Sequence, residues 1–274
     1  MRVLQAIFAF YVQGSIHVSL ALVALLAYAE ALVEGRVPGS YYALVFFGSI
    51  AGYNVLKATV TSGTKPRAGI RLRGGVAGLT VLAALLAVYF LFAIPLPYLA
   101  PLGFVFVFTV LYALPLYPGM KSLRGLGWFK ILWVALVWTL LTLWIPFAAD
   151  LSGTWDFRVE AFQRLLLVSL LMVPFEVRDM AVDPPDLLTL PRKFGLPATR
   201  ALGVAGAFVF LLLTALKDVP TGAEWMSKGF MAFWVALAIY RSGPENGRYF
   251  ASFWVETIPI GGYLTWVAWS SFAG

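Results

Sequence analysis

The sequence predicts an all-α integral membrane protein, because its composition, its long apolar runs and the placement of its basic residues all favour that class. Hydrophobic residues make up 61% of the 274 positions and charged residues 12%, far outside the range of soluble globular domains. Long apolar runs without alternation are typical of spanning helices, which satisfy their backbone polar groups internally. About nine such helices are expected in a single polytopic domain covering 1–274, at roughly 5–29, 40–59, 75–94, 98–117, 128–148, 160–177, 200–217, 225–241 and 249–271.

The first of these runs is predicted to be an uncleaved helix. Ala27-Tyr28-Ala29 resembles a signal-peptide cleavage site, but the apolar region is too long for a signal peptide and is interrupted by Gln13 and His17. His17 is the only histidine, and we expect it to be a hydrogen-bond partner between helices and not a catalyst.

The connections between the later runs differ in length on the two sides of the predicted bundle. The turns on one side are mostly short, as at 93–97, whereas long loops on the other side can cover a cavity. A functional site is therefore expected at the end that carries the long loops. These loops are roughly 60–74, 118–127 and 184–199.

The basic residues orient the chain. With the N-terminus inside, most of the 20 Lys and Arg residues flank the inner ends of the runs, and positive residues mark cytoplasmic loops. The net charge of +7 thus indicates topology and contact with anionic lipid of the bilayer, and nucleic acid is not an expected partner. We expect a prokaryotic inner membrane location, with the N-terminus and the long loops cytoplasmic and the C-terminus outside. The inner set is Arg2, Lys57, Lys65, Arg67, Arg71, Arg73, Lys121, Arg124, Lys130, Arg178, Arg192, Lys193, Arg200, Arg241 and Arg248, and the outer set is Arg36, Arg158, Arg164, Lys217 and Lys228.

An acidic segment at the end of the sixth run is the strongest functional signal. Glu176, Asp179 and Asp183 are spaced i, i+3 and i+7, which places them within roughly 60° on one helix face. Carboxylates at a membrane helix end are costly unless a cation accompanies them. A metal-bridged diphosphate suits this arrangement, because Mg²⁺ takes a few carboxylate oxygens and completes its shell with phosphate oxygens and water. A solvated acidic helix end is the alternative interpretation of the spacing alone.

The same segment resembles the second aspartate motif of the UbiA-type intramembrane prenyltransferases. In that family an Asp-x-x-Asp-x-x-x-Asp helix end leads into a loop with a Thr-Leu-Pro-like turn and a small Gly. Here the run is Phe175-Glu-Val-Arg-Asp179-Met-Ala-Val-Asp183, followed by Thr189-Leu-Pro-Arg-Lys-Phe-Gly195. The loop Tyr117-Pro-Gly-Met-Lys121-Ser-Leu-Arg124 is similar to the basic loop after helix 4 of that family. The resemblance implies a nine-helix bundle around a central cavity that opens to the cytoplasmic side.

The first aspartate motif of that family is reduced in this chain. The family has Asn-Asp-x-x-Asp at the end of helix 2, whereas the corresponding run here is Asn54-Val-Leu-Lys57-Ala58. Both carboxylates are missing, so one Mg²⁺ ion is expected instead of two. Lys57 lies on the same helix face as Asn54, where its ammonium group could neutralise a phosphate. A lysine that only reaches the lipid headgroups is the other interpretation.

The resemblance implies transfer of an isoprenoid chain from its diphosphate to a small lipophilic acceptor, such as an aromatic or quinone precursor. Glu256, inside the last run, is a candidate for orienting that acceptor or taking its proton, although a protonated or structurally paired carboxylate is the alternative. The expected site comprises Asp179, Asp183 and Asn54 as catalytic residues, Lys57, Lys121, Arg124, Arg178, Tyr117 and Glu256 as substrate-binding residues, and Glu176, Asp179 and Asp183 as metal ligands.

Three other functions stay open at this point. The missing first motif favours a non-catalytic protein of the same fold that binds an isoprenoid diphosphate or lipid. Polar residues at mid-depth also occur in small membrane transporters. A terpene cyclase on the same scaffold would use the same ionisation of a diphosphate with no acceptor.

Overall fold

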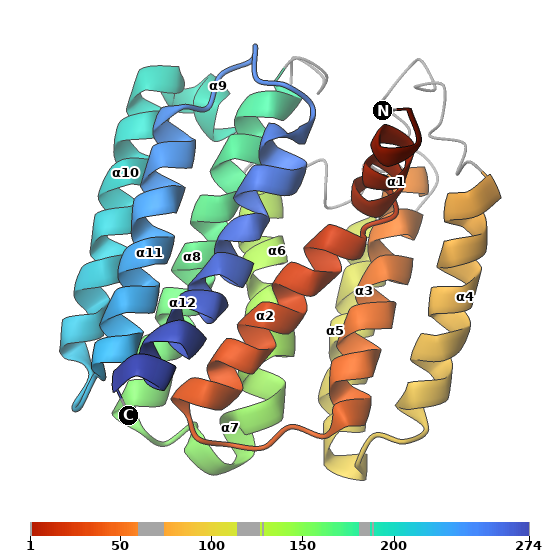
Figure 1. Ribbon diagram of the computed structural model, residues 1–274, viewed down its shortest axis with the longest axis horizontal. Coiled ribbons are helices and arrows are strands. Elements are labelled where there is room, and N and C mark those ends of the chain that lie inside the picture. The colour runs from red at the N-terminus through yellow and green to blue at the C-terminus, as the bar shows by residue number, and fades with distance from the viewer. Residues whose placement is uncertain are drawn as a thin grey trace.

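The computed structural model describes residues 2–59, 74–113, 127, 129–180, 187 and 189–273, and the regular elements within these ranges are all helices. The helices lie alongside one another as a bundle, with the N-terminus at one end and the C-terminus at the other (Figure 1). The end with the N-terminus and α9 is called the inner end below, and the opposite end the outer end. The elements are α1 Arg2–Gln13, α2 Ile16–Leu32, α3 Gly39–Thr59, α4 Gly74–Leu91, α5 Leu96–Ala113, α6 Phe129–Thr139, the π-helix η2 Leu140–Trp144, α7 Ile145–Leu151, α8 Trp155–Asp179, α9 Leu190–Phe194, α10 Leu196–Leu212, the 3₁₀-helix η3 Leu213–Leu216, α11 Gly222–Tyr240, the π-helix η4 Phe250–Val255 and α12 Thr257–Ala273.

The all-α class is confirmed, and each apolar run predicted from the sequence overlaps one or more helical segments. Among the described residues, three helices are long and apolar enough to cross a membrane, and a bent pair adds a fourth if it is counted as one span. The nine-span arrangement therefore stays a prediction for the other segments. The three helices are Gly74–Leu91, Phe129–Leu151 and Leu196–Leu216, and the bent pair is Val3–Gln13 with Ile16–Leu32.

The expected continuous helix over 5–29 is wrong, because the chain breaks at Gly14 and Ser15 and bends by 56° between α1 and α2. Ser15 has φ 62° and ψ 16°, in the left-handed region, which a non-glycine residue adopts only at a cost. A side chain on Gly14 would lie 2.8 Å from the carbonyl oxygen of Phe10 and 2.9 Å from Cδ2 of Leu79. Glycine is thus required at the break by the close approach of its neighbours.

Two wide π-helical segments occur in the bundle, and a proline follows each of them. The segment η2 joins α6 to α7, whereas η4 precedes α12. Pro146 and Pro259 each lack an N–H, and their rings crowd the carbonyl four residues earlier. Those carbonyls lie within η2 and η4, where the wider turn gives the ring room. Hydroxyl and imidazole groups from other helices then bond to carbonyls of these segments. Tyr41 Oη donates to the Leu141 oxygen at 2.8 Å, and His17 Nε2 lies 3.0 Å from the Phe253 oxygen.

The best-buried face belongs to α2, which packs against α3 on one side and α12 on the other (Figure 1). Ala21, Leu25, Leu26 and Ala29 of α2 are fully buried. In contrast, α4 at the edge of the bundle exposes a row of large apolar side chains, which suits contact with lipid tails. That row comprises Val81, Leu82, Leu85, Val88 and Tyr89.

A buried network of charged side chains joins the outer halves of α8 and α11. The Glu160 carboxylate on α8 receives Lys228 Nζ of α11 at 2.7 Å, Lys217 Nζ at 3.0 Å and Arg164 Nη2 at 3.2 Å. Glu224 receives the same two ammonium groups, at 2.6 Å from Lys228 and 2.5 Å from Lys217. Burial lowers the pKa of Lys217, but the carboxylates of Glu160 and Glu224 outweigh that effect and raise this pKa above its ordinary value.

The remaining hydrogen bonds of this network tie it to two further helical segments. Arg164 Nη1 donates to the Leu25 oxygen of α2 at 2.8 Å and to Thr142 Oγ1 of η2 at 3.0 Å. Lys228 also donates to Gln163 at 2.5 Å, so all three of its N–H groups meet an acceptor. Because an unpaired charge in such surroundings is very costly, this network fixes α2, η2, α8, η3 and α11 relative to one another.

Neutralising Glu160 should therefore destabilise the protein strongly. Glu160→Gln keeps the side-chain shape but leaves three cations facing one carboxylate, and we expect a loss of about 3–5 kcal/mol in the free energy of unfolding. Thermal unfolding of the purified protein in detergent measures the loss. Asp150→Asn, which neutralises an exposed carboxylate near the same end, is the matched control. Equal melting temperatures for the two variants would contradict the importance of the network.

Candidate functional site

Two carboxylates of the acidic segment lie at the inner end of α8 and face one lysine. Lys130 Nζ of α6 lies 2.6 Å from Glu176 Oε1 and 3.8 Å from Asp179 Oδ2. The prediction that Glu176 and Asp179 share one helix face is thereby confirmed. The Glu176 side chain is fully buried, whereas that of Asp179 is 19% exposed. The third carboxylate, Asp183, lies outside the described residues.

Lys130 is the site residue that the sequence interpretation missed. It was grouped with the residues that flank inner helix ends, yet its side chain is only 7% exposed and turns into the bundle. The sequence did contain a signal for this ion pair. Burying a lysine in the first turn of a long apolar helix costs free energy unless the ammonium group pairs with an anion. Its neighbours on α6 are aromatic, and Trp133 stacks on Phe108 of α5 with ring centroids 3.7 Å apart.

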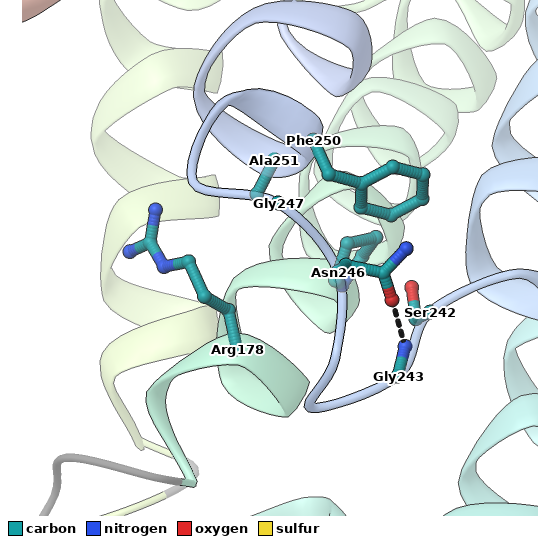
Figure 2. Close-up of a pocket in the computed structure, with 8 residues that line it drawn as sticks. Arg178, Ser242, Gly243, Asn246, Gly247, Phe250 and Ala251 are labelled. Carbon is teal, nitrogen blue, oxygen red and sulfur yellow. Dashed lines mark hydrogen bonds between the residues drawn. The ribbon is translucent and has the colours of Figure 1, made fainter.

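Arg178 completes the charged group at this helix end. Its Nε and Nη2 atoms both lie 2.9 Å from Asp179 Oδ1, and its guanidinium lies over the Phe175 ring at 4.9 Å. The side chain borders a crevice too narrow to hold a water molecule, whose other wall is the loop after α11. Figure 2 shows Arg178 rising from the end of α8 beside this loop, with its guanidinium pointing away from Phe250.

The loop of the second motif is held by Arg192 of α9, a residue not among the predicted site residues. Arg192 Nη2 donates to the Met180 oxygen at 2.9 Å, and Nη1 donates to the Leu187 oxygen at 3.3 Å. Gly195 ends α9 with φ 80°, in the left-handed region that glycine adopts readily. This geometry gives a physical reason for the small Gly at the end of the motif.

Asn54 lies at the break between α1 and α2, where its amide group is fully engaged. Its Nδ2 donates to the Gly14 oxygen at 3.1 Å and to Thr80 Oγ1 at 3.0 Å, and its Oδ1 accepts from Ser15 Oγ at 2.7 Å. The residue is fully buried. These bonds assign Asn54 a structural part in the break; its predicted catalytic role stays a prediction.

Lys57 also faces the break, and it connects the break to the charged site. Its Nζ donates to Ser15 Oγ at 2.7 Å and to the Gln13 oxygen at 3.3 Å, where a cation compensates the negative end of α1. The expectation that Lys57 shares a face with Asn54 is confirmed. Its charge also interacts electrostatically with those of Glu256 and Arg178.

Glu256 lies at the junction of η4 and α12, half-buried and facing the same region. Its carboxyl group interacts electrostatically with Lys57 and with Arg178. His17 fixes this junction, because its Nε2 bonds to the Phe253 oxygen and to Thr257 Oγ1, each at 3.0 Å. The predicted role of His17 as a hydrogen-bond partner between helices is confirmed.

Of the predicted site residues, the described part of the chain thus brings Glu176, Asp179 and Arg178 into one charged group, while Lys57 and Glu256 interact with Arg178 only electrostatically. Tyr117, Lys121, Arg124 and Asp183 lie outside it. Comparisons of the chain with protein-family models, with curated proteins and with solved structures found no match.

The described residues do not suit a magnesium ion. They contain no group of three or more His, Cys, Asp or Glu side chains that could hold a metal. Glu176 is already paired with Lys130, and Asp179 with Arg178. Mg²⁺ prefers carboxylates whose charge is not already neutralised, together with near-octahedral oxygen ligands. The Mg²⁺ expectation, with Asp183 among its ligands, stays a prediction.

Replacing Asn54 should destabilise the break between α1 and α2. In Asn54→Leu three hydrogen bonds disappear, and the buried Gly14 carbonyl loses a donor. We expect a loss of about 2–4 kcal/mol in unfolding free energy, measured by thermal unfolding, whereas Ser49→Ala on the same helix should leave the melting temperature nearly unchanged. A stable Asn54→Leu protein would show that these bonds do not support the break.

Proposed function

We propose that this chain is an integral membrane protein of the UbiA type that binds an isoprenoid diphosphate at its inner end and transfers the prenyl chain to a small lipophilic acceptor. The observation that carries the proposal is the meeting of cations from two helices with the carboxylates at the end of α8. Lys130 of α6 lies 2.6 Å from Glu176, and Arg178 of α8 lies 2.9 Å from Asp179. The charge of Lys57 of α3 interacts electrostatically with those of Arg178 and Glu256. Such a cluster suits a polyanion whose apolar tail enters the membrane.

The reaction requires little more than charge stabilisation and exclusion of water. The C1–O bond of the prenyl diphosphate breaks, and its electron pair leaves with the diphosphate, whose charge Arg178 and Lys57 would stabilise as it develops. A nucleophilic carbon or oxygen of the acceptor then forms a bond to C1. The proton that the acceptor loses would pass to the Glu256 carboxylate, which interacts electrostatically with Lys57 and Arg178. The π-helix before Glu256 sets the position of that carboxylate.

A non-catalytic protein that binds an isoprenoid diphosphate is the second candidate, favoured by two particular contacts. Asn54 is engaged in the helix break and Glu176 in an ion pair, so neither is free for chemistry without rearrangement. Release of inorganic diphosphate from geranylgeranyl diphosphate, assayed with a panel of phenolic acceptors, separates the two. A transferase releases diphosphate in multiple turnovers, whereas a binding protein releases none above background.

The proposed topology predicts which ends of the bundle face the cytoplasm. The chain has no cysteine, so single cysteines can be labelled cleanly with a membrane-impermeant maleimide. Val219→Cys, at an exposed outer turn, should be labelled in intact spheroplasts, and Glu245→Cys, in the inner loop after α11, only after lysis. The reverse pattern, or labelling of both in intact spheroplasts, would contradict the proposed orientation.

The diphosphate site predicts a specific thermal shift. Geranylgeranyl diphosphate with Mg²⁺ should raise the melting temperature of the purified protein, since a ligand at about 100 times its Kd adds about 2.7 kcal/mol to stability. Geranylgeraniol, which lacks the diphosphate, should not. Arg178→Gln should lose most of the shift, whereas Arg241→Gln, an exposed arginine on the same side, should keep it. An unchanged melting temperature for the parent protein in every condition would refute the proposed site.

A further inference from the structure

Lys130 lies where a divalent cation would be expected to bridge two carboxylates of a helix end. Its ammonium nitrogen is 2.6 Å from Glu176 Oε1 and 3.8 Å from Asp179 Oδ2. The two carboxylates are one helical turn apart on α8, and the lysine reaches them from α6. The single ammonium group of Lys130 on α6 thus lies near both carboxylates of the neighbouring helix α8.

Among the described residues, each of the two carboxylates at this helix end is paired with a cation. Glu176 meets Lys130, and Asp179 meets Arg178. Glu176 is fully buried and Lys130 nearly so, so a divalent ion could bind there only by displacing a buried ammonium group. Displacement would leave that ammonium unpaired in apolar surroundings, which is strongly unfavourable.

The cations that border the site keep donors for an anion. Arg178 is 36% exposed and uses Nε and Nη2 on Asp179, so as far as the described residues go its Nη1 group is available. Lys57 uses two of its three N–H groups, on Ser15 and on Gln13. A phosphate group can therefore be bound by nitrogen donors at this end without a bridging metal.

We propose that Lys130 takes the place of a metal ion at the end of α8, and that an isoprenoid diphosphate binds here without Mg²⁺. The inference rests on the proposed function and specifies how its ligand is recognised. The diphosphate is bound by the remaining N–H donors of Arg178 and Lys57, while Lys130 neutralises Glu176 and, together with Arg178, Asp179. These carboxylates would otherwise repel the diphosphate. Lys130 is a positioning residue in this scheme.

Direct binding measurements in the presence and absence of the metal test this inference. The full-length protein in nanodiscs is dialysed against EDTA and titrated with geranylgeranyl diphosphate, once in EDTA and once in Mg²⁺. The expected dissociation constants agree within about threefold. Binding that is more than about tenfold weaker in EDTA would overturn the metal-free site while leaving the proposed function intact. Failure to bind in either buffer would overturn both.

Variants of the ion pair sharpen the test. Lys130→Met alone leaves a buried carboxylate without its cation, so the matched double variant Lys130→Met/Glu176→Gln removes both charges together. We expect the double variant to fold, because it buries no unpaired charge, and to lose at least about tenfold in affinity in EDTA, since Asp179 then has no lysine beside it. Lys193→Met, an exposed lysine on α9, should bind like the parent.

The single variant gives a qualitative readout that a merely structural lysine would not give. In Lys130→Met the two carboxylates of α8 are left for a divalent ion, so added Mg²⁺ should raise its melting temperature and restore geranylgeranyl diphosphate binding. The parent should show neither effect of Mg²⁺. A double variant that binds in EDTA as tightly as the parent, or a parent that Mg²⁺ stabilises as much as it stabilises Lys130→Met, would overturn the inference.

Discussion

Helix α8 carries buried charges in both halves, and each must meet a partner from another helix, because an unpaired charge in apolar surroundings costs several kcal/mol. In the outer half, Glu160 meets Lys228 of α11 and Lys217 at the end of η3. At the inner end, Glu176 meets Lys130 of α6. These contacts fix the rotation of α8 about its axis, and with it the direction in which Asp179 points. The position of the candidate site therefore depends on charge pairing along the whole helix.

Departures from regular helix place the other polar groups of the site. The break at Gly14 and Ser15 turns α1 away from α2 and leaves the Gln13 oxygen and the Ser15 hydroxyl as acceptors for Lys57. The π-helix η4 directly precedes Glu256, whose charge interacts with those of Lys57 and Arg178. His17 links the two irregular segments, since it follows the break directly and bonds to the Phe253 oxygen within η4. Strained or widened backbone commonly occurs where a protein positions functional side chains.

Much of this arrangement follows from sequence patterns with a direct physical cause. Apolar runs predicted where helices lie, and the i, i+3 spacing predicted that Glu176 and Asp179 share a face. The break between α1 and α2 and the π-helices η2 and η4 were not predicted, although Gly14, Pro146 and Pro259 are residues that often mark such irregularities. The buried ion pair of Lys130 was not predicted, because a basic residue near a helix end can either face the cytoplasmic headgroups or pair with a buried carboxylate. Only the packing of α6 on α8 decides between them, and that packing depends on contacts far apart in the sequence.

The two charge clusters of α8 differ in exposure, and that difference decides which of them can bind a ligand. In the outer cluster Arg164 is 1% exposed and Lys228 is fully buried, with their donors directed at protein acceptors, so an incoming anion would have to break existing bonds. At the inner end Arg178 is 36% exposed and Asp179 19%, and the guanidinium keeps donors for a ligand. A charged ligand loses less hydration at a partly open site and still gains contacts with buried groups behind it. The outer cluster therefore holds the bundle together, and the inner cluster is the one whose exposure suits the proposed exchange of a diphosphate.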